Sequence, residues 1–197
     1  MNNFEVASCL ESMQIIVDSN EQPSERAFKR YNSFGVPYGV QKIDYGDYTY
    51  NFKLPNGKWI YEPNTRLYPP VSIERKADLV ELSQCFCQSR ERFTRGFERA
   101  KANKAKMYLL VENASWENLI NGKYATKYNP KAYFASITAW QARYGIQTIF
   151  CKQETSGKLI KRNIVQRVKR TIRRRILRFG GGEKWNIHRC IMQQLNI

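Results

Sequence analysis

The stretch Val71-Ser72-Ile73-Glu74-Arg75-Lys76 reads as an apolar strand that ends in three charged residues. Side chains on a strand alternate between its faces, so Glu74 and Lys76 point one way and Arg75 points the other. An acid and a lysine are therefore presented together at a strand end. Gly46-Asp47 lies in an earlier segment rich in Tyr, Ile and Thr, and Asp47 on a neighbouring strand would bring a second carboxylate to the same place.

Strands and helices alternate around this stretch. We expect strands at 14–18, 40–53, 58–61, 71–76, 106–111 and 146–151, and helices at 24–35, 78–103, 115–121, 129–145 and 157–178. This interleaving predicts a single α/β domain over residues 1–155. A basic C-terminal helix and tail, residues 156–197, is expected to pack on the same domain.

Charge is distributed unevenly along the 197 residues, whose formal net charge is +16. Residues 1–89 hold nine Lys and Arg against eleven Asp and Glu, whereas residues 90–197 hold 24 against six. A charge this one-sided favours a polyanionic partner, most often nucleic acid, over a surface tuned only for solubility. The residues predicted to contact nucleic acid are Arg90, Arg92, Arg95, Lys169, Arg170, Arg173 and Arg174.

Other composition features exclude several classes of protein. The five cysteines are scattered and the only histidine is His188, which argues against a disulfide framework, a zinc site and histidine-based catalysis. No apolar run approaches the roughly 20 residues of a membrane-spanning helix, and the N-terminus lacks the features of a signal peptide. We therefore expect a cytoplasmic protein that has no membrane partner.

Acidic residues at strand ends are the candidates for chemistry. Asp18 directly follows the apolar run Ile15-Ile16-Val17, and Glu21 lies three residues later. Carboxylates brought close together repel each other, and a divalent cation such as Mg²⁺ relieves the repulsion. A lysine beside them, Lys76, can orient a water or neutralise a developing anion. Each residue alone reads more readily as a surface acid, but Asp18, Asp47 and Glu74 together favour a site.

Three motifs resemble the XPF-type nuclease domain of the PD-(D/E)xK superfamily. They are Ile16-Val17-Asp18-Ser19-Asn20-Glu21, Gly46-Asp47 and Ile73-Glu74-Arg75-Lys76. The family signature is Gly-Asp, a gap and Glu-Arg-Lys-x-x-x-Asp, preceded by Val-Asp-x-Arg-Glu. The resemblance covers residues 14 to about 112, with Arg92-Phe93 and the strand-end acid Glu112. Compact members of this type occur in phages and prophages.

The resemblance implies a restriction-endonuclease-like mixed sheet flanked by helices, and a Mg²⁺- or Mn²⁺-dependent endonuclease acting on branched or flapped DNA. Repair and recombination, at the nucleoid or in a phage-infected host cell, are the settings it implies. It assigns catalysis to Asp18, Asp47, Glu74, Arg75 and Lys76. It makes Asp18, Asp47 and Glu74 the metal ligands. Glu21, Asp78 and Glu112 are further possible residues of the site.

The sequence departs from the family pattern at three points. Asn20 stands where the early motif has arginine, and Val80 stands where an aspartate is expected, so that Asp78 or Glu81 would have to substitute. No tandem helix-hairpin-helix region is evident, and the basic C-terminal helix can take over its DNA-holding role.

Two other functions remain open at this level. One is a non-catalytic, structure-selective nucleic-acid-binding protein on a nuclease fold, and the other is a ribosomal-type RNA-binding protein, which the acids at strand ends disfavour. Relatives often form homodimers. The helix face of Tyr133, Ile137, Trp140 and Tyr144 could serve in a dimer, but a core role is the first expectation.

Overall fold

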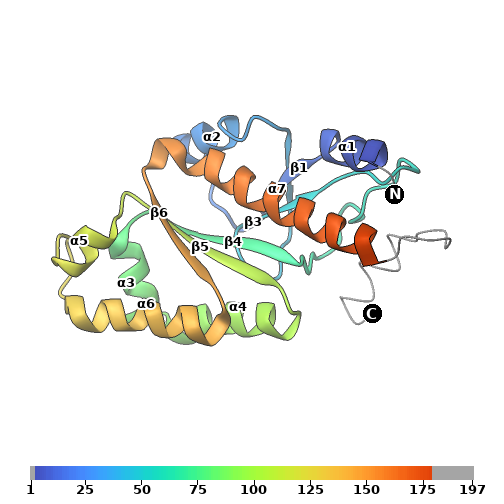
Figure 1. Ribbon diagram of the computed structural model, residues 1–197. Helices are drawn as coiled ribbons and strands as arrows, with labels where there is room; N and C mark the ends of the chain where they lie inside the picture. The colour runs from blue at the N-terminus through green and yellow to red at the C-terminus, as the bar shows by residue number, and fades with distance from the viewer. Residues whose placement is uncertain (1–2, 179–197) are drawn as a thin grey trace.

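A six-stranded mixed sheet organises the fold in the computed structural model, which describes residues 3–178 and the side chains of residues 5–170. The strand order is β2-β1-β3-β4-β5-β6 (Figure 1). The strands are β1 (Gln14–Asp18), β2 (Tyr38–Gln41), β3 (Tyr48–Asn51), β4 (Val71–Lys76), β5 (Lys106–Glu112) and β6 (Gln147–Cys151). β3 is antiparallel to both neighbours, and the other pairs are parallel. The predicted mixed α/β architecture is therefore confirmed.

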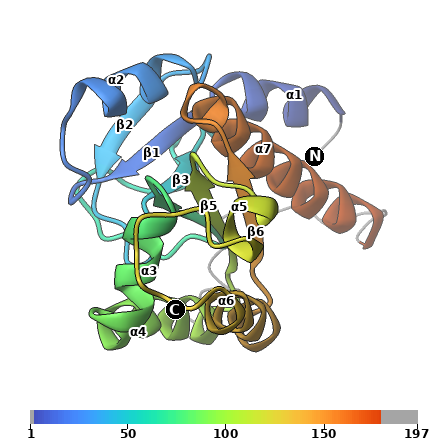
Figure 2. The ribbon, with the colours of Figure 1, turned by 90° about the vertical axis from the view of Figure 1, so that its left-hand side faces the viewer.

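Helices cover both faces of the sheet, as Figures 1 and 2 show from two directions. One face carries α1 (Asn3–Glu11), α2 (Glu25–Asn32) and α7 (Gln153–Arg178), and the other carries α3 (Leu79–Cys87), α4 (Arg90–Ala102) and α6 (Pro130–Tyr144), with α5 (Trp116–Ile120) beside α6. Two hydrophobic cores result. Ile73 and Leu110 belong to the core under α2 and α7, whereas Leu109 and Val111 belong to the core under α3, α4 and α6. Alternation along β4 and β5 thus decides which side chain reaches which layer.

Two predicted elements are each divided in the structure. The helix expected at 78–103 is wrong as one element, because the chain leaves the helical conformation at Ser89 between α3 and α4. The break lets Phe86, Phe93 and Phe97 all contact Trp140, with ring centroids 4.8–5.3 Å apart. The strand expected at 40–53 is also wrong, since residues 42–47 leave the sheet to connect β2, parallel to β1, with β3, antiparallel to it.

Two smaller differences occur near the N-terminal half of the sheet. The strand expected at 58–61 is reduced to one bridge between Lys53 and Trp59. α1, which the sequence analysis missed, places Cys9 in the core under α7.

The long basic helix is confirmed, and it begins at Gln153. Ile160, Ile164 and Val168 are buried against the sheet. Gly157 lets α7 approach α2, because a Cβ at this position would clash with Ser33 Oγ and the Arg30 carbonyl. The boundary at 155/156 stays a prediction, and residues 179–197, with His188, lie outside the described part.

The face of α6 expected to be core is confirmed as core. Tyr133, Ile137 and Trp140 are buried, and Tyr144 is half-buried and packs against the same core. Among the described residues, none of the helices is long and apolar enough to cross a membrane.

Candidate active site

The 42–47 connection between β2 and β3 brings Asp47 against the end of β4. The Asp47 N–H donates to the Ile73 carbonyl at 2.8 Å, and the Asp47 carbonyl accepts from the Asp18 N–H at 2.8 Å. Gly46 precedes it with φ +78°, and a Cβ there would clash with Ser72 Oγ. Glycine is required at this position both for the left-handed backbone and for the close approach. The Gly46-Asp47 pair thus places the Asp47 carboxylate beside β4.

Asp47, Glu74 and Lys76 converge at the floor of a cleft. Asp47 Oδ2 accepts a hydrogen bond from the backbone N–H of Arg75 at 2.6 Å, and Lys76 Nζ donates to Glu74 Oε1 at 2.7 Å. Burial, followed by the nearby Glu74 carboxylate, holds the pKa of Asp47 well above its usual range. Burial alone would lower the pKa of Lys76, but Glu74 and Asp47 outweigh it and raise that pKa. The floor therefore holds two acids whose repulsion one lysine only partly relieves.

The oxygens at this floor suit a hard divalent cation. In the described part of the chain, no hydrogen-bond donor contacts Asp47 Oδ1 or Glu74 Oε2, and both residues line the cleft. A positive ion here would lower the cost of ionising Asp47 beside Glu74. No group of three or more His, Cys, Asp or Glu side chains among the described residues is arranged to hold a metal. Two carboxylates fit Mg²⁺, which keeps several waters and takes substrate phosphate oxygens as its other ligands.

Asp18 lines the same cleft but is held by other groups. Its Oδ1 accepts from the Ile43 N–H at 2.9 Å, and Lys42 Nζ lies 3.5 Å from both carboxylate oxygens. The Asp18 side chain fixes the start of the 42–47 connection, while the Asp18 backbone N–H donates to the Asp47 carbonyl. Asp18 Oδ2, with only the long contact to Lys42, keeps acceptor capacity toward the cleft.

Basic side chains form the walls of the cleft, whose volume is about 630 Å³. Arg92, Arg95 and Arg99 come from α4. Lys42 comes from the connection between β2 and β3, and Arg66 comes from the connection between β3 and β4. The sequence analysis missed the buried Asp44, which joins the walls: its carboxylate lies 2.9 Å from Arg99 Nε and 3.0 Å from Arg66 Nε. The only sequence signal for Asp44 was its place three residues before Asp47.

Arg75 points to the opposite face of the sheet, as the alternation predicted, and joins a buried charged network. Arg75 Nη1 donates to Glu112 Oε2 at 3.3 Å, and Arg30 Nε donates to Glu112 Oε1 at 2.9 Å. Tyr48 accepts from Arg30 Nη1 at 3.0 Å and donates to Glu21 Oε1 at 2.9 Å. We call these five residues the buried network. Two guanidinium groups balance two carboxylates here, and the sequence analysis named Glu21 and Glu112 but not Arg30 or Tyr48.

The two acids considered for the shifted family position both cap α3. Asp78 Oδ1 accepts from the Glu81 N–H at 2.8 Å, and Glu81 Oε2 accepts from the Ala77 N–H at 2.7 Å. Such reciprocal bonds resemble a capping box and fix the helix start. Glu81 also lines the cleft, with Oε1 3.9 Å from Lys76 Nζ.

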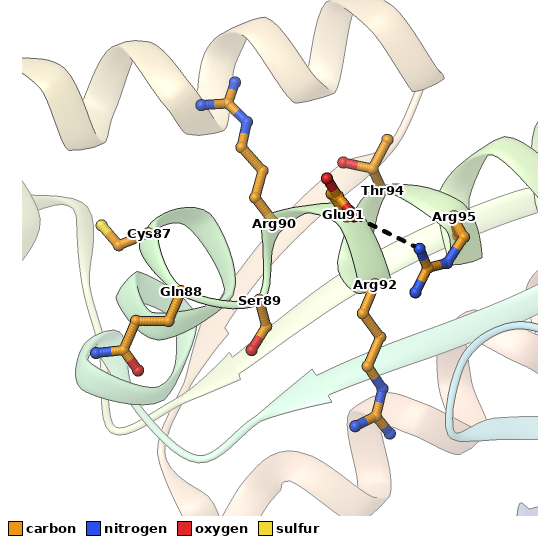
Figure 3. A pocket seen from close by; sticks show the side chains of 8 residues that line it. All are labelled: Cys87, Gln88, Ser89, Arg90, Glu91, Arg92, Thr94 and Arg95. Atoms are coloured by element: carbon orange, nitrogen blue, oxygen red, sulfur yellow. Dashed lines mark ion pairs between the residues drawn. The ribbon is translucent and has the colours of Figure 1, made fainter.

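The residues predicted to contact nucleic acid do not share one surface. Arg92 and Arg95 line the cleft, and with Arg90 they also line a second pocket where α3 meets α4, which Figure 3 shows. In that view the side chains of Arg90 and Arg92 point in opposite directions. Arg95 is 3.8 Å from Glu91 in an exposed ion pair. Lys169 and Arg170 lie on α7, on the far face of the sheet. The side chains of Arg173 and Arg174 lie outside the described part.

A comparison with known protein families agrees with the arrangement of this site. The profile of the ERCC4 domain matches residues 17–162. The chain belongs to the ERCC4 domain family. This is a nuclease family, so the predicted resemblance is confirmed. No curated protein matches the chain.

Solved structures share the fold of this ERCC4 domain. XPF from Aeropyrum pernix is 17% identical with a TM-score of 0.53, over 78% of this chain and 61% of that chain. XPF from Aeropyrum pernix in complex with DNA is 16% identical with a TM-score of 0.54, over 80% and 66%. The chain therefore spans less than two thirds of either relative. The predicted restriction-endonuclease-like fold is confirmed.

Proposed function

We propose that this ERCC4 domain is a divalent-metal-dependent endonuclease that hydrolyses phosphodiester bonds in branched or flapped DNA. The observation that carries the proposal is the pairing of Asp47 and Glu74 beside Lys76, on the floor of a cleft with basic walls. Family membership and the DNA complex of a similar structure support a DNA substrate. Repair or recombination in the cytoplasm, at the nucleoid or during phage infection, is the setting we propose, and the homodimer stays a prediction.

The proposed roles follow from the contacts. Asp47 and Glu74 would hold Mg²⁺ or Mn²⁺, which would supply an activated water and stabilise charge on the phosphate. Asp18 lines the same cleft and stays a predicted third ligand. Lys76 is restrained by Glu74 and by the ring of Phe93, whose centroid is 5.3 Å from Nζ. It remains protonated, because its pKa is raised, and so can donate to a phosphate oxygen as negative charge develops. Arg92, Arg95 and Arg66 attract the phosphate backbone into the cleft.

Cleavage of end-labelled substrates by the full chain tests the proposal. Fork, flap, four-way junction and linear duplex are incubated with Mg²⁺, Mn²⁺ or EDTA. We expect metal-dependent products from the branched substrates, and strongly reduced product with Asp47→Asn or Lys76→Ala. Glu117→Gln and Lys123→Ala make the same charge changes at exposed sites and should cut normally. Full cleavage by Asp47→Asn would overturn the site.

The predicted alternative, a non-catalytic binding protein on a nuclease fold, gives a different result. The ion pair between Glu74 and Lys76 and the absence of an acid at Val80 are the features that favour it. It requires tight, salt-sensitive binding of the same substrates without metal-dependent products.

A further inference from the structure

The outer side of α7 carries basic residues at regular helical spacing. Lys158, Arg162 and Arg170 are exposed, and Gln166 occupies the fourth exposed position of the series. These residues recur every four positions, whereas Ile160, Ile164 and Val168 of the same helix face the sheet. We call Lys158, Arg162, Gln166 and Arg170 the α7 ridge.

The cations of the α7 ridge have no acidic partner in the described part of the chain. Among the described residues, no carboxylate lies within ion-pair distance of Lys158, Arg162 or Arg170, and Glu154 is the only acid in α7. Twelve residues of helix span about 18 Å. DNA carries one phosphate per roughly 3.4 Å on each strand, so the ridge matches about five consecutive base pairs.

The α7 ridge and the catalytic cleft lie on opposite faces of the sheet. The cleft is lined by residues of α3 and α4 and by the 42–47 connection, with none from the described part of α7. Figures 1 and 2 agree in placing α7 and α4 in different layers. A straight duplex that lies against one face cannot reach the other without sharp bending, which is energetically costly.

We propose that the α7 ridge binds the phosphate backbone of a second duplex arm while the cleft holds the strand to be cut. The inference rests on the proposed function, and it names branched DNA with arms reaching both faces as the preferred substrate. A junction supplies such arms without bending. The ridge contributes affinity and orientation but no sequence readout, because phosphates alone are contacted.

Binding in EDTA tests the α7 ridge separately from cleavage. The triple variant Lys158→Ala/Arg162→Ala/Arg170→Ala is compared with Lys58→Ala/Lys123→Ala/Lys127→Ala, which removes the same charge from exposed sites elsewhere. The ridge variant should lose on the order of tenfold in affinity for a four-way junction, and its salt slope should fall by about 0.9 per lost contact. A duplex of about 12 base pairs, roughly 40 Å long, should be affected much less. Equal losses on both substrates, or no loss on either, would overturn the proposal.

Photo-crosslinking provides an arm-specific readout. Gln166→p-benzoylphenylalanine marks the α7 ridge, and Asn20→p-benzoylphenylalanine marks the cleft, where Asn20 is exposed. We expect the two probes to label different arms of one junction, and labelling of the same arm would contradict the proposal. If the arms differ but metal-dependent cleavage is absent, the proposed nuclease activity fails while the binding surface stands.

Discussion

The two faces of β4 treat charge in opposite ways. On the face of α2 and α7, the buried network pairs Arg30 and Arg75 with Glu21 and Glu112, and Tyr48 bridges them. On the face of α3 and α4, Lys76 forms an ion pair with Glu74, and the Asp47 carboxylate lies nearby without an ion pair of its own among the described residues. One strand thus carries a neutral cluster on one side and an acidic, cleft-facing cluster on the other.

The difference indicates that the buried network has a structural role, whereas the cleft has a chemical one. Buried ions are tolerated only when each is paired and hydrogen-bonded, so the neutral network serves to hold Arg75 in place. The backbone N–H of Arg75 donates to Asp47 Oδ2, so the network that holds the Arg75 side chain also helps to position Asp47 at the floor of the cleft. The cleft keeps a repulsion between Asp47 and Glu74 that Lys76 relieves only in part and that a bound cation would relieve further.

The largest expected effect is on the cleft side of this comparison. Lys76→Ala should lower the cleavage rate by about 10²–10³-fold, since it removes a cation aimed at developing negative charge. Substrate affinity in EDTA should change little, because Arg92, Arg95 and Arg66 still supply the basic walls. Single-turnover kinetics and binding measurements separate the two quantities. A loss confined to affinity would mean that Lys76 acts only in binding.

Removing a charge from the buried network should lower the stability of the protein. Arg30→Met leaves Glu112 and Glu21 with one cation fewer in a buried site and should cost about 3–5 kcal/mol in the free energy of unfolding. Arg26→Met, on the exposed side of the same helix, is the matched control and should cost less than about 0.5 kcal/mol. Urea denaturation measures both. Equal effects would mean that the network contributes no more than a surface charge.

The packing that brings α7 onto the network can be tested next. Gly157→Ala places a methyl group against Ser33 and the Arg30 carbonyl, and should cost about 1–3 kcal/mol through overpacking. Gly96→Ala, in a helix where a Cβ meets no atom within 4 Å, should instead stabilise the protein by about 0.5–1 kcal/mol. Thermal unfolding of the two variants gives the comparison. Similar melting temperatures would show that the close approach is not required.

Local sequence rules predicted more of the fold than of the site. The strand period placed Glu74 and Lys76 opposite Arg75, and caps such as Asn129 and Gly145 marked helix ends correctly. The break at Ser89 was missed because the contacts that it allows, those of Phe86 and Phe93 with Trp140, join residues far apart in sequence. Arg30 and Asp44 were missed for the same reason, since a charge becomes part of a network only through distant partners.

The smallest effect is a pH-dependent stability carried by Asp47. Burial and Glu74 raise its pKa in the folded protein, so the folded state holds a proton that the unfolded state has already released. The contribution of this proton to the free energy of unfolding is fully present below the ordinary aspartate pKa of about 3.9. It is lost as pH rises through the pKa of Asp47 in the folded protein. Metal-free wild-type protein should therefore lose stability relative to Asp47→Asn as pH rises, as measured by urea denaturation in EDTA. Mg²⁺ should reverse the trend, because it favours the ionised carboxylate. A difference between wild type and Asp47→Asn that does not change with pH would show that the cleft floor, like the buried network, has its charges already satisfied.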